Sequence, residues 1–121
     1  MIEVEKRIGT SGIIEYLIKG TETLHREDGP ALISPYGNKF WYRYGKMHRD
    51  EGPAVEWDSG MKEWYRNGKL HREDGPAVIY VDGAVEWWFN DVFFKSKEEW
   101  FENLPECKKK EMLYSEPFIR G

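Results

Sequence analysis

The sequence predicts a mainly β protein: a single-layer antiparallel meander of about four hairpins in ~23-residue repeats, closed by a C-terminal helical cap. Residues 64–77 recur at 41–54 and in part at 24–31, and the three histidines are spaced 23 residues apart. Aromatic residues make up 16% of a chain whose mean hydropathy is only −0.76. Burial must therefore rest on a few large side chains, which suits a thin sheet.

The hairpins follow from strand patterns separated by turn residues. Residues 2–8 begin with alternating apolar and charged side chains, and residues 9–12 form a turn before the β-rich run 13–18. The later strand pairs are 31–34 with 39–43, 54–57 with 61–66, and 77–81 with 84–89. Asp82-Gly83 predicts a two-residue type I′ hairpin turn. Further turns follow the second strands at Gly20, Gly45, Gly68 and Asn90-Asp91.

A helical segment is predicted after the last repeat. Ser96 and Glu99 have the spacing of a capping box, and Pro105 ends or redirects the helix that follows. Residues 106–114 favour a second short helix, and 115–121 look irregular. We expect the apolar side of the first helix to cover the last hairpin. The chain then divides into a repeat sheet (1–94) and a helical cap (95–121), which fold as one cooperative domain.

Composition limits the classes of function. The net charge of −4 argues against general nucleic-acid binding, which needs a cationic surface. Cys107 is the only cysteine, so the chain forms no internal disulfide. The N-terminal residues are charged, and no apolar run is long enough to span a membrane. These features predict a soluble cytoplasmic protein.

Each repeat linker carries His-Arg followed by two acids and Gly-Pro-Ala. Histidines and carboxylates bind metals, but equivalent residues one repeat apart lie about 10 Å from each other, too far to share one ion. A general acid or base is needed at one site, whereas this pattern recurs, so we expect no catalytic residue, metal or cofactor. The linker residues are predicted to have structural roles or to contact anions; they are His25, Arg26, His48, Arg49, His71 and Arg72.

Adjacent aromatic residues on the second strands predict a binding surface. Strand side chains alternate, so both faces of the sheet carry aromatics. One face can pack against the linkers and the terminal helix, while a single-layer sheet has no second layer to cover the other. The candidate contact residues are Trp41, Arg43, Trp64, Arg66 and Trp87, with Tyr42, Tyr65 and Trp88 on the opposite face.

The repeat unit resembles the MORN repeat in a variant form. The resemblance rests on Trp64-Tyr65-Arg66-Asn67-Gly68-Lys69, the following His71 and the return to Asp82-Gly83. The Gly-Pro-Ala version with a Ser-Lys-Glu-Glu-Trp-Phe helix is similar to small repeat proteins of tailed phages and bacteria. The resemblance implies scaffolding, protein contact and sometimes lipid association, without a catalytic residue. The acidic balance weakens the lipid option.

The sequence therefore predicts a non-enzymatic protein-interaction module. If it is phage-encoded, it would act in the host cytoplasm as an inhibitor of a host defence or host enzyme. The alternative is a protein that binds or sequesters a small nucleotide or another anionic ligand, with aromatic rings stacking on the base. Unprotected edge strands and an aromatic face also predict a homo-oligomer.

Overall fold

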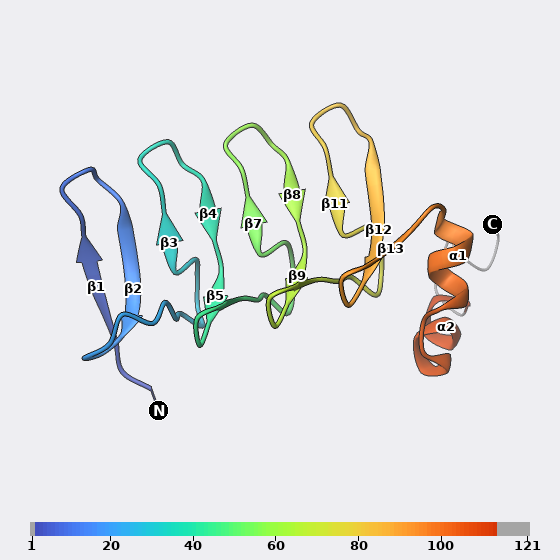
Figure 1. Ribbon diagram of the computed structural model, residues 1–121, viewed down its shortest axis with the longest axis horizontal. Coiled ribbons are helices and arrows are strands. Elements are labelled where there is room, and N and C mark those ends of the chain that lie inside the picture. Colours follow the sequence, from blue (N-terminus) through green and yellow to red (C-terminus); the bar gives the residue numbers. More distant parts are fainter. Residues whose placement is uncertain (1, 114–121) are drawn as a thin grey trace.

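The computed structural model describes residues 2–113, which form a row of β-hairpins followed by two short helices (Figure 1). Four long hairpins stand side by side in one antiparallel sheet, which confirms the predicted meander. Their strands are β1 (Val4–Ile8) and β2 (Ile14–Ile18), β3 (Leu32–Ile33) and β4 (Lys39–Phe40), β7 (Val55–Glu56) and β8 (Lys62–Glu63), and β11 (Val78–Ile79) and β12 (Val85–Phe89).

The turn of the last long hairpin differs from the prediction. Tyr80 N–H donates to the carbonyl of Ala84, and Gly83 N–H donates to the carbonyl of Tyr80. These bonds enclose three residues, with Gly83 at a φ of 93°. The expected two-residue type I′ turn at Asp82-Gly83 is therefore wrong. A three-residue loop needs positive φ at its last position, which is where the glycine lies.

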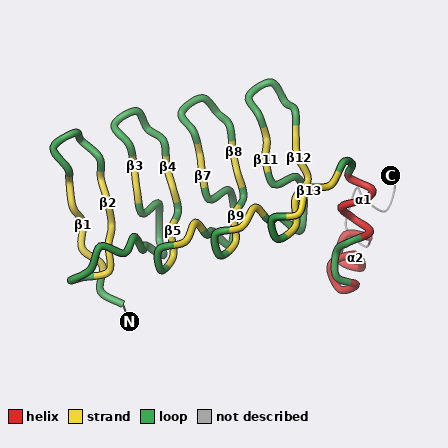
Figure 2. The backbone as a smooth tube through the Cα atoms, viewed as in Figure 1, coloured by secondary structure: helices red, strands yellow, loops and turns green. Residues whose placement is uncertain are grey.

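A second, short hairpin lies at the lower end of each later repeat (Figure 2). Two of these pair β5 (Tyr42–Arg43) with β6 (Lys46–Met47) and β9 (Tyr65–Arg66) with β10 (Lys69–Leu70); in the fourth repeat β12 itself continues and pairs with β13 (Val92–Phe94). Their two-residue turns have positive φ at both positions, as in Asn67-Gly68 with 50° and 82°. The type I′ geometry thus occurs here.

The strands predicted at 39–43 and 61–66 are interrupted at Trp41 and Trp64 because the chain changes partner there. Trp64 N–H donates to the carbonyl of Ala77 at 2.7 Å, in the neighbouring long hairpin. Its carbonyl accepts from the N–H of His71 at 3.1 Å, in the linker behind the short hairpin. Each tryptophan therefore joins a long hairpin to a short one.

The buried core lies where the long hairpins, the short hairpins and the Gly-Pro-Ala linkers meet. We call these meeting points the repeat joints. It contains the three Gly-Pro-Ala alanines and the three histidines, with exposed fractions of 0–8%, together with Val55 and Val78. Within residues 2–113 no second sheet packs on this one, and successive repeats are held together by these joints and by the pairing of β2 with β3, β4 with β7 and β8 with β11.

The helices close the right-hand end of the row (Figure 1). They are α1 (Lys97–Glu102) and α2 (Glu106–Leu113). Ser96 Oγ accepts from the N–H of Glu99 at 3.2 Å, as the capping box predicts. Tyr114 and residues 115–121 lie outside the described residues. Within 2–113, neither helix has the length and apolar character needed to cross a membrane.

Candidate functional site

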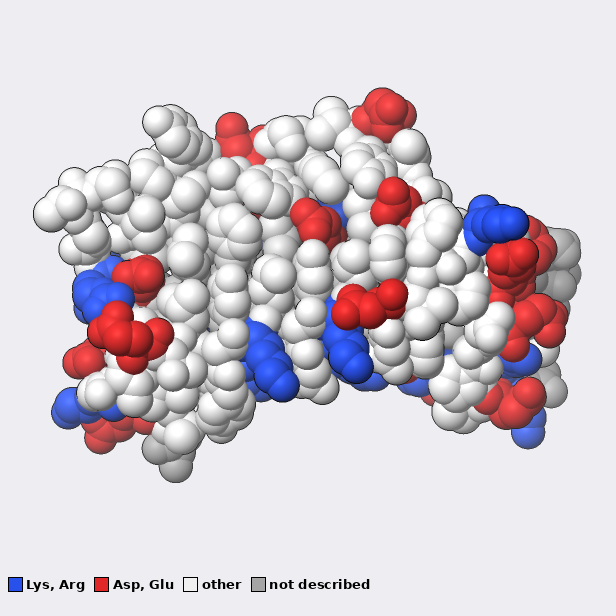
Figure 3. Space-filling model, in the orientation of Figure 1, with Lys and Arg blue, Asp and Glu red and all other residues white. Residues whose placement is uncertain are grey.

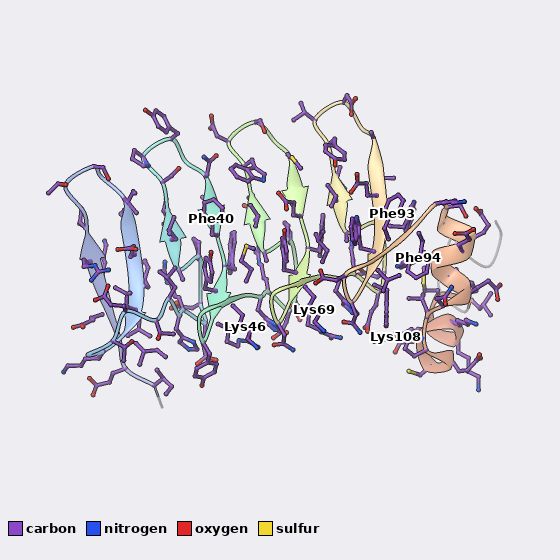
Figure 4. The ribbon with its side chains drawn as sticks, viewed as in Figure 1. Phe40, Lys46, Lys69, Phe93, Phe94 and Lys108 are labelled. Carbon is purple, nitrogen blue, oxygen red and sulfur yellow. The ribbon has the colours of Figure 1, made fainter. Side chains whose placement is uncertain are left out.

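The two faces of the sheet carry different chemistry. Residues directly opposite each other on paired strands share a face, and the register joins Phe40, Val55, Glu63, Val78 and Glu86 in one row. We call this the front face, which is turned toward the reader in Figure 4. The opposite, rear face carries Trp41, Trp64 and Trp87, which are neighbours of front-face residues along their strands.

Each repeat joint stacks an arginine on an aromatic ring of the rear face. The guanidinium carbon of Arg72 lies 3.9 Å from the centre of the Trp64 ring, and its Nη1 donates to the carbonyl of Pro76 at 2.9 Å. Arg49 lies over Trp41 in the same way, and Arg26 over Tyr16. These contacts combine cation–π attraction with a charge-assisted hydrogen bond.

The glycine of Gly-Pro-Ala closes the other side of each guanidinium group. A Cβ atom at Gly75 would lie 2.7 Å from the guanidinium carbon of Arg72, and equivalent clashes occur at 2.9 Å for Gly29 and 3.0 Å for Gly52. The arginine is therefore held between an aromatic ring and a bare backbone. This explains why the linker motif repeats Arg and Gly at a fixed spacing.

The last joint uses the cap in place of an arginine. Trp100 is fully buried, its ring centre lies 4.7 Å from that of Trp87, and its Nε1 donates to the carbonyl of Arg72 at 3.0 Å. The predicted contact residues Trp41, Trp64 and Trp87 thus each have one ring face covered. These tryptophans are half-buried, and each packs against a structural partner on one side.

Arg43 and Arg66, the other predicted rear-face contacts, are engaged within the joints. Arg43 pairs with Asp50 at 2.9 Å, and Arg66 pairs with Glu73 at 3.2 Å. Hydrogen bonds that the Asp50 carboxylate accepts from His48 and Arg43 hold its pKa below its ordinary value. These ion pairs are partly exposed, so each contributes about 0–1 kcal/mol.

Each histidine ties its repeat to the next short hairpin. The Nδ1 atom of His71 accepts the N–H of Asn90 at 3.1 Å; His48 accepts that of Asn67, and His25 that of Tyr44. A ring nitrogen that accepts a hydrogen bond carries no proton. This contact therefore requires the neutral histidine ring, with its proton on Nε2. Burial lowers the pKa of His71, although the hydrogen bond to Glu73 opposes this shift.

The front face contains two carboxylates that accept hydrogen bonds from aromatic side chains. Glu63 accepts from Trp57 Nε1 at 2.6 Å and from the hydroxyl of Tyr65 at 3.0 Å. Glu86 accepts from the hydroxyl of Tyr80 at 2.8 Å and from Trp88 Nε1 at 2.9 Å. The same aromatic–carboxylate–aromatic unit therefore occurs in two successive repeats.

The surroundings of Tyr65 and Tyr80 disfavour the charged form of both phenols. Burial, with the nearby Glu63 charge, raises the pKa of Tyr65 well above its ordinary value. The hydrogen bond to Glu86 raises the pKa of Tyr80. Both phenols therefore stay neutral donors at physiological pH.

The front face is largely free of cations across its middle. Figure 3 shows acidic groups within this surface, while Lys and Arg gather along its lower edge and at its ends. Aromatic rings are partly accessible: Trp57 is 36% exposed and Phe93 51%. Phe40 packs edge-on against Trp57, and Trp88 against Phe93, so the rings form pairs along the face.

The sequence predicts Tyr42, Tyr65 and Trp88 as contact residues, and all three are half-buried. It does not predict the residues that hydrogen-bond with or lie beside Tyr65 and Trp88. The missed residues are Trp57, Glu63, Tyr80 and Glu86. A signal was present, because Glu63 and Tyr65, like Glu86 and Trp88, are two positions apart on a strand and therefore share a face.

A pocket of about 540 Å³ is lined by the linker residues 49–52 and 71–74, by residues 64–66 and by α2. Its lining includes Trp64, Arg49, Arg72 and Lys108. The lining cations already pair with carboxylates: Arg49 with Glu56, Arg66 with Glu73, Arg72 with Asp74, and Lys108 with Glu73 and Glu111. An anionic ligand would have to compete with these groups.

Among residues 2–113, no three His, Cys, Asp or Glu side chains gather closely enough to hold a metal ion. Comparisons with known protein families, curated proteins and solved structures find no match for this chain.

Proposed function

We propose that this protein is a non-enzymatic interaction module whose front face binds another protein. The observation that carries the proposal is the difference between the two faces. The rear tryptophans are half-buried and each packs against Arg49, Arg72 or Trp100, whereas two front-face rings, Trp57 and Phe93, are exposed.

The composition of the front face supports protein binding. Tyrosine, tryptophan and phenylalanine are enriched at protein interfaces, where they supply large contact areas with few rotatable bonds. Here the rings of Trp57, Tyr65, Tyr80 and Trp88 are already oriented by hydrogen bonds to carboxylates. Binding would therefore immobilise few additional rotamers.

The experiment compares variants of the two faces. Trp57→Ala with Phe93→Ala removes exposed front-face rings, while Ile8→Ala with Val85→Ala removes exposed apolar side chains from the rear face as a matched control. Each purified protein is used to capture partners from a cell lysate. We expect a partner that is retained by the control and lost by the front-face variant. Equal capture by both variants would refute the proposal.

The pocket beside α2 provides a second candidate, a site for a small anionic ligand such as a nucleotide. It combines the Trp64 and Tyr65 rings with several cations, and it has less support because those cations are paired. A thermal-shift screen of nucleotides and cyclic dinucleotides tests it through linkage. A rise in Tm that is lost in Lys108→Ala supports the candidate, and an unchanged Tm across the screen removes it.

A further inference from the structure

We propose that Glu63 and Glu86 bind two arginine side chains of the partner, each guanidinium group contacting both carboxylate oxygens and an adjacent aromatic ring. This inference rests on the proposed function, because it names the chemistry that the same front face recognises. It predicts a cationic partner segment with two arginines at a defined spacing.

The first argument is the unused acceptor capacity of the two carboxylates. Each oxygen of an ionised carboxylate can accept about two hydrogen bonds, whereas each oxygen of Glu63 and Glu86 accepts one here. One acceptor direction thus remains on both oxygens of each group. A guanidinium group presents two parallel N–H donors and matches that arrangement, which a lysine ammonium group does not.

The second argument is an internal precedent in the first repeat. Glu15 lies in the same front-face row, since it pairs with Leu32, which pairs in turn with Phe40. Arg7 donates to a single oxygen of Glu15, Oε1, through Nε at 3.1 Å and Nη2 at 3.0 Å, and it binds both carboxylate oxygens of Glu22. This protein therefore already places a guanidinium group on the equivalent carboxylate.

The later repeats lack such an internal arginine. The strand neighbours of Glu63 are Val55 and Val78, which are 2% and 3% exposed, and Glu86 pairs with the same Val78. Within residues 2–113, the partners of both carboxylates are aromatic N–H and O–H groups rather than cations. A cationic side chain would supply the missing charge in a partly desolvated setting, where ion pairing is stronger than in open water.

The adjacent rings add a second contact for the same group. Trp57 and Tyr65 lie beside Glu63, and Tyr80 and Trp88 lie beside Glu86, each held by its polar atom. Guanidinium groups stack on aromatic faces, as Arg72 does on Trp64 in this protein. Arginine is therefore favoured by both the carboxylate and its surroundings.

The repeat sets the spacing between the two arginines. Glu63 on β8 and Glu86 on β12 are separated by β11, so they lie about two strand spacings, or about 9.6 Å, apart. A polyproline II helix rises about 3.1 Å per residue with three residues per turn, so side chains three positions apart share a face at about 9.3 Å. We therefore infer an Arg-x-x-Arg segment in the polyproline II conformation.

The test titrates the full-length ¹⁵N-labelled protein with the peptide acetyl-Gly-Arg-Pro-Pro-Arg-Gly-amide and follows the tryptophan side-chain N–H signals by NMR. Trp57 and Trp88 are local reporters, because their Nε1 atoms donate to the two carboxylates. We expect these two signals to shift in a saturable manner while those of Trp41 and Trp64 on the rear face remain in place.

Three controls define the recognition. The Glu63→Gln/Glu86→Gln variant should bind at least about tenfold more weakly, since it removes two charge-assisted contacts, and the matched Glu15→Gln variant should bind like the wild type. A Lys-Pro-Pro-Lys peptide should bind at least about threefold more weakly. A Glu-Pro-Pro-Glu peptide should not bind, a result that does not depend on the folding of any variant.

Unmoved Trp57 and Trp88 signals at millimolar peptide, or equal affinities for the arginine and lysine peptides, would overturn the inference. The proposed function has a separate outcome. A captured partner that depends on Trp57 and Phe93 but is unaffected by Glu63→Gln/Glu86→Gln would leave the front face as the interaction surface and remove arginine recognition.

Discussion

The glycine beside the stacked arginine gives a sharp test of how the repeats are joined. In Gly75→Ala, the added Cβ would lie 2.7 Å from the guanidinium carbon of Arg72. Ordinary carbon–carbon contacts lie at about 3.5–4.0 Å, so the group must retreat by roughly 1 Å. That movement weakens the stack on Trp64 and the 2.9 Å hydrogen bond to the carbonyl of Pro76.

The expected cost follows from those two contacts. A partly buried cation–π contact contributes about 0.5–2 kcal/mol, and a hydrogen bond from a charged donor contributes about 1.5–3 kcal/mol. Both are weakened rather than removed, so the free energy of unfolding should fall by about 2 kcal/mol. The ion pair with Asp74 adds little, because the aspartate side chain is 82% exposed.

A double-mutant cycle isolates the clash. Unfolding in urea, followed by tryptophan fluorescence, is measured for Gly75→Ala, Arg72→Ala and the double variant. Once Arg72 is truncated, Gly75→Ala should change stability by less than about 0.5 kcal/mol. Gly9→Ala is the matched control, because its nearest neighbour would lie at an ordinary 3.7 Å. Additive losses in the double variant would refute the sandwich of ring, arginine and glycine.

Three further predictions concern the other parts of the joints. The free energy of unfolding should fall as pH drops below about 6.5, the ordinary histidine pKa, because His71 takes up a proton more readily in the unfolded chain than when buried. Urea midpoints measured between pH 8 and 5.5 test this. His71→Gln should reduce the dependence of the midpoint on pH. Trp100→Ala should cost about 3–5 kcal/mol by opening the cap, with faster hydrogen exchange in β12 and no change in β1. Asn67→Ala should cost about 1 kcal/mol at its φ of 50°, whereas Asn67→Gly should be nearly neutral by the same urea assay.

The repeat architecture was predictable because the linker motif and the turn glycines recur at a nearly constant spacing along the chain. The spacing of the turn glycines located the long hairpins, and Ser96 with Glu99 located the start of α1. The returning strands of the short hairpins were not predicted, because β6 and β10 contribute only two residues each and β13 only three. Asn67-Gly68 carries the sequence signal of a type I′ turn, whereas Asp82-Gly83, for which that geometry is expected, closes a three-residue loop.

The candidate site was only partly predictable, for a reason of geometry. The sequence shows Trp64 and Arg72 eight positions apart, and only the fold stacks one on the other. Without that contact, Trp64 looks like an exposed ring. The front-face group could have been found by pairing Glu63 with Tyr65 along the strand, but Trp57 reaches Glu63 across a hairpin.

Photo-crosslinking tests most directly whether the front face binds a protein. The photoreactive residue p-benzoylphenylalanine is placed at position 57 on the front face or at position 62, which is exposed on the rear face one residue before Glu63. Irradiation in cells should give a defined protein adduct from position 57 and none from position 62. An adduct confined to position 62, or no adduct from either position, would contradict the assignment of the front face as the interaction surface.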